Sequence, residues 1–419
     1  MLMTVIAIYT LYVISKLYVS IMQVGFINQH KHQDALLMPA NEYMKAGDYA
    51  VAKEKLTMLS TLIEYVLFIV WMGGGLMWLS NATMAYDGAM QSIIAVLSFI
   101  IINGVVSFPL EWYSKFVLDE KFGFNRSSYA QYFKDTAIST ALTIVIGALI
   151  VWGIYAIIIS TELWWLWSFG FIFAVIILIN MFFPTIRALF FDKLTPLEDE
   201  ELNKEITRLM DATGFVSSGV FISDASKRDA KLNAYFGGLG KTKRVVLFDT
   251  LIEKLSAKEL LAVLGHELGH FAHGDIYKNI AMVGGMLFVM FALFGNLPES
   301  LYLEMGLSSS PYILMILFLL LMPVVSFVMM PIMGIVSRHN EYEADKTGAE
   351  LGGSEHLIAA LKKLVTENKS FPLSHPLYIF FYYTHPPVIE RFKELGVNVY
   401  AKEEDRVVDS LGGICSSGE

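Results

Sequence analysis

The segment SAKELLAVLGHELGHFAHGD, residues 256–275, contains the pentapeptide HELGH from His266 to His270. On a helix, residues four apart lie one above the other, so both imidazoles can reach one tetrahedral metal ion. Glu267 lies between them, where a carboxylate can act on a water molecule beside the metal. The segment therefore predicts a helix that carries a zinc site with hydrolytic chemistry.

The residues before the histidines support a helix. Ser256 and Glu259 match the capping box that begins many helices, and leucines and a valine between residues 260 and 264 supply an apolar face. A buried helix whose two histidines bind no metal is the alternative, because short motifs of this kind also occur by chance.

A third metal ligand must come from elsewhere in the chain. The metzincin pattern requires a glycine and a third histidine where this chain has His273 and Ile276, so that class is excluded. The candidate is Glu341, which shares a helical face with Asp345 in the segment SRHNEYEAD. We expect Glu341 to bind the metal and Asp345 to hold the far nitrogen of a histidine ligand. A solvated acidic helix face is the alternative.

His273 lies on roughly the same helical face as His266. Seven residues correspond to about 10 Å along a helix, which is too far for both to share one ion with His270. We therefore expect His273 to neighbour the ligands or to lie on the surface.

The composition indicates a membrane protein. Hydrophobic residues make up 55% of the 419 residues and charged residues only 17%, and the mean hydropathy is +0.53. We expect a mainly α-helical fold with seven transmembrane helices, because apolar runs long enough to cross a bilayer occur seven times. The runs are Leu2–Gly25, Met58–Leu79, Ile93–Phe116, Thr136–Ile159, Leu163–Leu189, Ile280–Leu297 and Pro311–Val336.

The loops between the runs predict the orientation in the membrane. Residues 80–91, 160–162 and 296–310 contain no Lys or Arg, whereas residues 28–55 and 117–134 contain several each. Basic loops stay on the cytoplasmic side. We therefore expect a multi-pass protein with its N-terminus outside and its C-terminus and catalytic segments in the cytoplasm. The membrane would be the bacterial cell membrane, or that of the endoplasmic reticulum in a eukaryote, and the first run is predicted to be retained rather than cleaved.

The runs divide the chain into four parts. Residues 1–190 would hold five membrane helices, 191–279 a catalytic segment, 280–336 two more membrane helices and 337–419 a second catalytic segment. A strand is predicted at 219–223 and a hairpin or small sheet over 233–238 and 244–248, just before the HELGH helix. We expect an extended peptide to add to a strand edge beside the metal.

Other features exclude some functions. A net charge of −9 without a basic cluster argues against nucleic acid as a partner, and the chain has no glycine-rich phosphate loop. The single cysteine, Cys415, excludes an internal disulfide.

Five stretches together resemble the type I CAAX prenyl endopeptidases, integral-membrane zinc metalloproteases named for cutting C-terminal tripeptides from prenylated proteins. The stretches are residues 120–125 (EKFGFN), 226–235 (SKR through NAY), 266–270 (HELGH), 337–345 (SR through E to D) and 376–386 (PLY through HP).

The resemblance implies one zinc ion per chain, held by His266, His270 and Glu341, with Glu267 as the general base. It also implies substrate binding by Asn233 and Ala234 on a strand, and by His385 and Arg391, which would reach toward the scissile carbonyl and the peptide. We expect His385 to act in catalysis as an oxyanion donor. The implied fold is a ring of seven helices around a large chamber in the membrane, capped by a small α+β catalytic domain.

A second His-Pro pair, at His375 and Pro376, lies close before the first. Pro387 and Arg391 follow His385 and favour it as the catalytic histidine, while the role of His375 stays open.

Three functions remain. The first is a prenyl-type endopeptidase, and the second is a general quality-control protease for membrane proteins with the same chemistry. Both would act on a peptide or protein substrate, prenylated or not, in contact with membrane lipid. The third is a non-enzymatic receptor or channel with a structural zinc site, against which Glu267 argues, because a structural site needs no general base.

Overall fold

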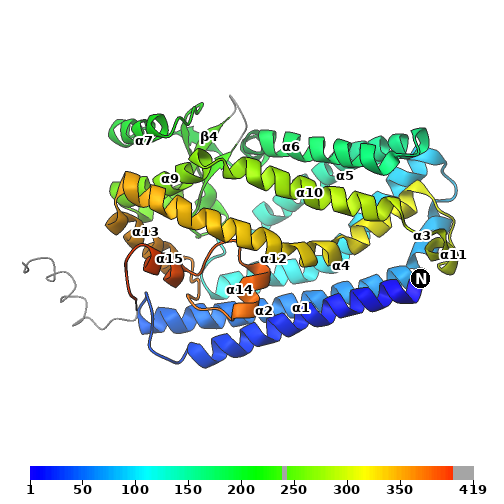
Figure 1. The fold of residues 1–419 in the computed structure, drawn as a ribbon, viewed down its shortest axis with the longest axis horizontal. Helices are drawn as coiled ribbons and strands as arrows, with labels where there is room; N and C mark the ends of the chain where they lie inside the picture. Colours follow the sequence, from blue (N-terminus) through cyan, green and yellow to red (C-terminus); the bar gives the residue numbers. More distant parts are fainter. Residues whose placement is uncertain (238–242, 400–419) are drawn as a thin grey trace, which may run out of the picture.

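The computed structural model describes residues 1–237 and 243–399 of the chain. Long helices run side by side along the longest axis, and a small sheet with several shorter helices gathers at one end (Figure 1). The catalytic segments predicted from the sequence meet at this end, which we call the catalytic end. Gly238 and Cys415 lie outside the described residues.

Seven helices in the described part of the chain are long and apolar enough to cross a membrane, and each contains all or nearly all of one predicted apolar run. The predicted number is therefore confirmed. The helices are α1 (Leu2–His30), α2 (Ala40–Val70) with its continuation α3 (Leu76–Thr83), α4 (Gly88–Tyr113), α5 (Tyr129–Ser160), α6 (Trp164–Phe190), α10 (Asp275–Gly295) and α12 (Pro311–Gly352).

The second of these helices is not regular, unlike the single run predicted from the sequence. A π-helical turn, η1 (Trp71–Gly75), separates α2 from α3, and Gly74 has a φ of 142°. Only glycine adopts this φ readily, so the triple glycine of the run allows the change in direction. A second π-helical turn, η2 (Ser114–Asp119), extends α4.

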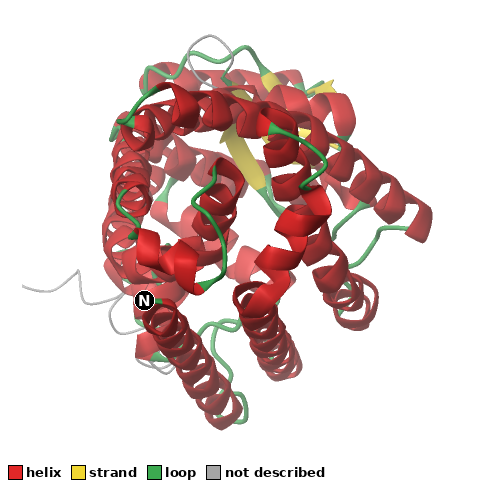
Figure 2. Cartoon of the chain, turned by 90° about the vertical axis from the view of Figure 1, so that its right-hand side faces the viewer, coloured by secondary structure: helices red, strands yellow, loops and turns green. Residues whose placement is uncertain are grey.

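The long helices form a closed ring. Along the ring α1 packs on α2, α2 on α4, α4 on α5, α5 on α6, α6 on α10 and α10 on α12, and α12 returns to α1. Seen end on, from the side opposite the catalytic end, the long helices follow this ring, and the strands lie farther back, at the catalytic end (Figure 2).

Two helices of the ring have little buried surface. Only 6% of the most apolar window of α5 and of α6 is buried, and Val151 is the one fully buried residue recorded in α5. A helix that packs tightly in a bundle buries at least one face. The α5 and α6 helices therefore leave most of their apolar side chains at least partly exposed.

The catalytic end contains a four-stranded sheet in the order β1-β2-β4-β3. The strands are β1 (Leu194–Pro196), β2 (Val220–Ser223), β3 (Ala234–Gly237) and β4 (Arg244–Phe248). The predicted hairpin is confirmed, because β3 pairs antiparallel with β4, while β2 joins β4 in parallel. Strand β3 is therefore at one edge of the sheet.

Shorter helices surround the sheet and connect it to the ring. They are α7 (Glu200–Ala212), the 3₁₀ turn η3 (Ala225–Lys227), α8 (Asp249–Lys254), α9 (Ala257–Ala272), α13 (Ser354–Glu367), α14 (Pro376–Tyr382) and α15 (Val388–Glu394). The short helix α11 (Glu299–Glu304) lies at the opposite end of the molecule.

Helix α12 belongs to both parts of the molecule. Its first half packs into the core of the ring through apolar residues such as Ile313, Ile316 and Leu317. Its second half carries the buried polar residues Glu341 and Asp345 and packs against α9.

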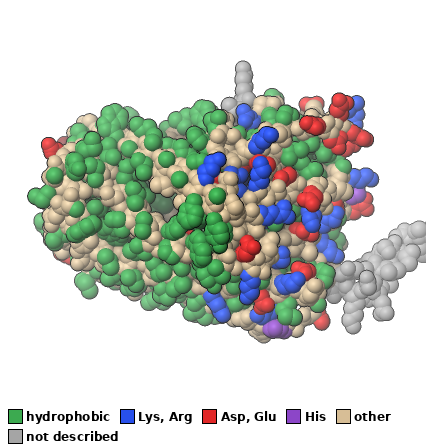
Figure 3. Space-filling model, turned by 180° about the vertical axis from the view of Figure 1, so that it is seen from behind, with side chains coloured by type: hydrophobic (Ala, Val, Ile, Leu, Met, Phe, Trp, Pro, Cys, Tyr) green, Lys and Arg blue, Asp and Glu red, His purple; other side chains and the backbone are tan. Residues whose placement is uncertain are grey.

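Charged side chains follow the same division. Lys, Arg, Asp, Glu and His side chains gather around the catalytic end, while hydrophobic side chains cover most of the rest of the visible face (Figure 3).

Candidate active site

Helix α9 carries the HELGH motif and begins with the predicted capping box. The Ser256 hydroxyl accepts a hydrogen bond from the Glu259 backbone N–H, and the Glu259 carboxylate accepts one from the Ser256 backbone N–H at 2.8 Å. Lys363 of α13 donates to the same carboxylate at 2.7 Å, which fixes the start of α9 to its neighbour.

Glycines allow α9 and α12 to approach each other closely. A Cβ atom added at Gly348 of α12 would lie 2.9 Å from the backbone N of His266, and one at Gly352 would lie 2.3 Å from the Cα of Ala262. On α9, a Cβ at Gly269 would lie 3.1 Å from the Cα of Ala344. This backbone contact brings the histidines of α9 within reach of the carboxylates of α12.

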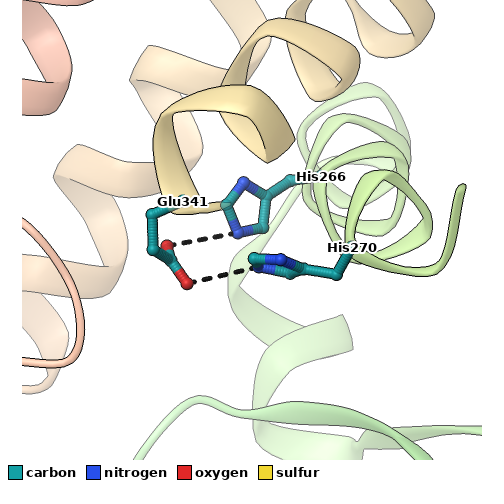
Figure 4. A group of neighbouring side chains, drawn as sticks. All are labelled: His266, His270 and Glu341. Carbon is teal, nitrogen blue, oxygen red and sulfur yellow. Dashed lines mark ion pairs between the residues drawn. The ribbon is translucent and has the colours of Figure 1, made fainter. Parts of the chain in front are cut away.

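His266, His270 and Glu341 form a compact group of three potential metal ligands. One donor atom from each lies within 4.8 Å of the other two. The Nε2 atoms of His266 and His270 lie 3.6 Å and 3.2 Å from the two carboxylate oxygens of Glu341 (Figure 4). His266 and Glu341 are buried, whereas His270 is partly exposed.

A carboxylate holds the other nitrogen of each histidine. Nδ1 of His266 lies 2.9 Å from an oxygen of Asp345, and Nδ1 of His270 lies 2.9 Å from an oxygen of Asp275. A histidine that donates from Nδ1 presents the lone pair of Nε2 to a metal, and the carboxylate fixes the orientation of the ring. Both histidines therefore have the arrangement that metal ligands require.

The electrostatics of the group favour a cation. Burial by itself lowers the pKa of His270, but hydrogen bonds with Glu341 and Asp275 outweigh it and raise this pKa to about 9. The buried Oε2 atom of Glu341 has no hydrogen-bond partner in the described part of the chain. A buried carboxylate oxygen without a partner is costly, and a metal ion beside two imidazoles would satisfy it.

Arg391 of α15 contacts two carboxylates of this site, those of Asp345 and Glu341. Its guanidinium donates two hydrogen bonds to Asp345, at 2.7 Å and 2.6 Å, and its Nη1 lies 3.6 Å from Glu341. The side chain is buried, and the carboxylates raise the pKa of the guanidinium despite the burial. Asp345 is thus held in place by Arg391 while it orients His266.

A cavity of about 580 Å³ opens beside the three ligands. Its lining includes Asn233, Ala234, Glu267, His385 and Arg391. Nε2 of His385 lies 3.2 Å from Glu341, and 64% of the histidine side chain is exposed. The carboxylate of Glu267 makes no hydrogen bond to the described residues and is free to act in the cavity.

Comparison with known proteins decides the family. Residues 196–398 match the model of peptidase family M48, and residues 27–193 match the CAAX prenyl protease N-terminal model of five membrane helices. The CAAX prenyl protease 1 of Saccharomyces cerevisiae is 33% identical over 386 residues, covering 84% of this chain and 85% of that protein. The chain belongs to the CAAX prenyl protease 1 family.

A solved structure agrees with this assignment. The crystal structure of S. mikatae Ste24p is similar with a TM-score of 0.84 and 30% sequence identity, and the match covers 94% of this chain and 98% of that one. A homologue from Caenorhabditis elegans is 30% identical over 388 residues, covering 85% of this chain and 87% of that protein.

As a member of the CAAX prenyl protease 1 family, the chain is a multi-pass membrane metalloendopeptidase that acts on peptide or protein substrates. The resemblance inferred from the sequence is therefore confirmed. The non-enzymatic receptor or channel is excluded.

The resemblance implied that Arg391 contacts the peptide, and in the structure its side chain lines the cavity while its guanidinium binds Asp345. The guanidinium is directed at Asp345, so its first effect is to position that carboxylate. A direct contact between Arg391 and the peptide stays a prediction.

The remaining histidines near the CAAX prenyl protease 1 motifs lie outside the group. His273 ends helix α9, and its Nε2 lies 3.5 Å from the hydroxyl of Thr347. His375 precedes α14, where its Nδ1 accepts a hydrogen bond from the Leu377 N–H and its backbone N–H donates to Gln23. His375 therefore caps a helix and ties it to α1.

Asp275 is the member of the site that the sequence reasoning missed. It follows Gly274, whose left-handed backbone (φ 68°) ends the turn after α9 and directs Asp275 back toward His270. The signal in the sequence was an acidic residue directly after a His-Gly pair. The direction of the Asp275 side chain toward His270, however, depends on the turn at Gly274.

Proposed function

We propose that this protein is a zinc endopeptidase that cuts near the C-terminus of prenylated peptides or proteins. The observation that carries the proposal is one cavity that brings together Glu267, His385 and the start of an edge strand beside three side chains that could hold a metal ion. Relatives named CAAX prenyl proteases support the substrate class.

His266, His270 and Glu341 fit one zinc ion. Two imidazole nitrogens and one carboxylate form the ligand set of many catalytic zinc sites, and they leave one position open for water or substrate. When bound, zinc would lower the pKa of that water and polarise the peptide carbonyl.

Glu267 would act as the general base. It faces the cavity from the same turn of α9 as the two histidines, so it can take a proton from the attacking water and return it to the leaving amine. His385 would donate a hydrogen bond to the oxyanion from the exposed face of the cavity.

Asn233 and Ala234 would hold the peptide backbone. Ala234 begins β3, which pairs with β4 on one side only among the described strands, and both residues line the cavity. An extended peptide can add to the free edge of β3 through main-chain hydrogen bonds.

The open faces of α5 and α6 would accommodate a lipid chain. Both helices bury few of their apolar side chains within the protein. A prenyl group attached to the substrate would find apolar surface toward the middle of the ring.

We further propose that the catalytic end faces the cytoplasm and that the N-terminus lies outside. The N-terminal amine pairs with Glu304 at 2.8 Å, at the end of the molecule away from the site, where the loops contain no Lys or Arg. We also propose that the chain divides into residues 1–190, 191–279, 280–336 and 337–419. The second and fourth parts would form the site.

The test uses the purified, zinc-loaded protein with three substrates: a farnesylated CAAX peptide, the same peptide without the lipid, and an unfolded membrane protein. We expect cleavage of the farnesylated peptide, with kcat reduced by about 10²–10⁴-fold in Glu267→Gln. Cleavage of the unfolded protein alone would favour a quality-control protease, and equal cleavage of both peptides would contradict the role of the lipid.

A further inference from the structure

A second cavity lies beside the catalytic one and is lined by lysines. Its volume is about 590 Å³, and it shares Asn368, Ser370, Phe371 and Tyr383 with the lining of the catalytic cavity. The two cavities are therefore neighbours that share these side chains as part of their walls.

Three lysines line the second cavity: Lys53 of α2, Lys231 before β3 and Lys369 after α13. The structure records ring contacts for their ammonium groups and no ion pair with a described carboxylate. Lys231 and Lys369 lie 5.1 Å and 4.5 Å from the ring centre of Phe124, and Lys53 lies 5.5 Å from that of Tyr49. These three side chains are called the lysine cluster below.

The carboxylates around the lysine cluster have other partners. Glu54, which also lines the cavity, accepts a hydrogen bond from Tyr378 at 2.8 Å, and Asp119 accepts one from Tyr49 at 2.9 Å. Asp229 lies 3.7 Å from Lys115. The lining itself carries three ammonium groups and one carboxylate, an excess of positive charge that suits an anion, while Asp119 and Asp229 lie outside the lining and act on Lys53 from there.

The direction of the edge strand connects this cavity to the substrate. Strand β3 runs from Ala234 to Gly237, away from Lys231. A peptide added antiparallel to its free edge runs the opposite way, so its C-terminal part points toward Lys231. From Asn233 to Lys231 an extended chain advances about 7 Å, or about two residues.

The part of the β3 edge that can pair with a peptide also ends next to the lysine cluster. The side chain of Asn368 accepts a hydrogen bond from the Leu232 N–H at 2.9 Å and donates one to the Leu232 carbonyl at 3.2 Å. These backbone groups are then unavailable to a peptide, so pairing with the edge stops there. A short C-terminal tail fits this arrangement better than a chain that continues.

We propose that the lysine cluster binds the C-terminal carboxylate of the substrate and thereby sets how many residues lie between the cleaved bond and the end of the chain. The proposal rests on the proposed function and deepens it, because it explains how an endopeptidase site can select a bond near a terminus. Lys53, Lys231 and Lys369 are positioning residues for the substrate and take no part in the reaction.

The experiment compares a farnesylated peptide that ends in a free carboxylate with the same peptide as a C-terminal carboxamide. We expect the carboxamide to raise KM by about tenfold or more, because it removes a charge-assisted contact, with a smaller change in kcat. The triple variant Lys53→Gln, Lys231→Gln, Lys369→Gln should cleave both peptides alike, at the level of the carboxamide in the wild type.

Lys45→Gln is the matched control, because Lys45 lies on the same helix as Lys53 but pairs with Glu42 on the surface. This variant should keep the preference for the free carboxylate. If the triple variant does not fold, each single substitution should reduce the preference in part, with zinc content and melting temperature unchanged.

Equal KM values for the two peptides in the wild type would overturn the proposal and leave the proposed function intact. An unchanged preference in the triple variant would also overturn it, as expected if the lysines bind a lipid phosphate instead. Failure to cleave either peptide would contradict the proposed function. In that case, binding of both peptides to zinc-loaded Glu267→Gln still tests the lysine cluster, since that variant keeps the cavity.

Discussion

The α9–α12 contact and the α5–α6 pair differ in how closely their side chains are packed. Between α9 and α12 the backbones touch through glycines, and a single Cβ atom at Gly348 or Gly352 would overlap a neighbour. Along α5 and α6, by contrast, few side chains are fully buried. The chain is closely packed beside the candidate metal ligands and loosely packed along these two helices.

Glu341→Ala should have the largest effect, because it removes a ligand from the tightly packed region without changing its backbone. We expect the purified variant to contain no zinc and to have no activity. Metal analysis alongside an activity assay checks this, and a full complement of zinc in the variant would show that the ligand is assigned wrongly.

Glu267→Gln should lower the rate of hydrolysis without changing the packing of the site. The substitution keeps the shape of the side chain and the three ligands, so we expect normal zinc content and a loss of about 10²–10⁴-fold in kcat, the usual contribution of a general base. Turnover near the wild-type rate would remove Glu267 from the mechanism.

Gly348→Ala tests whether the close approach of α9 and α12 is required. The new methyl group would lie 2.9 Å from the backbone of His266, so the helices must separate. We expect destabilisation by about 1–3 kcal/mol, as for other overpacked cores, together with weaker zinc binding. Thermal unfolding in detergent and zinc titration provide the measurement, and an unchanged zinc affinity would contradict the link between packing and metal geometry.

Ser256→Ala should have a smaller effect in the same region. The Ser256 hydroxyl caps α9 through the Glu259 N–H, and the loss of such a cap costs about 1 kcal/mol. The melting temperature should fall slightly while zinc affinity is retained. A loss of zinc equal to that of Gly348→Ala would mean that the cap, rather than the helix contact, fixes the histidines.

Leu149→Ala, in the open region, should have the smallest effect. The side chain is 64% exposed on α5, so we expect a change within about 0.5 kcal/mol in detergent. A loss comparable to that of Gly348→Ala would show that α5 is packed as tightly as the catalytic end.

Local patterns predicted a large part of this structure. The seven apolar runs, the capping box and the spacing of His266 and His270 depend on residues that are near each other in sequence, and periodicity reveals such contacts. The hairpin of β3 and β4 was also visible as two β-rich runs separated by glycine.

The sequence could not predict the features that depend on where side chains point or on contacts between distant residues. Strand β1 has only three residues, too few to show alternation. Asp275 reaches His270 only because Gly274 turns the chain back, and Arg391 faces Asp345 rather than outward. The hydrogen bonds between Asn368 and Leu232 join residues 136 positions apart, and no local pattern in the sequence reveals such a contact.

Helix α12 places Glu341 far from the half of the helix that packs in the core of the ring. About 45 Å separate Pro311 from Glu341 along the 42-residue helix, given a rise of 1.5 Å per residue. A tilt of about three degrees at the membrane end would therefore displace Glu341 by ~2 Å, enough to spoil its coordination geometry. The packing of the first half of α12 in the core of the ring therefore also affects the geometry of a group of side chains that lies far outside that core.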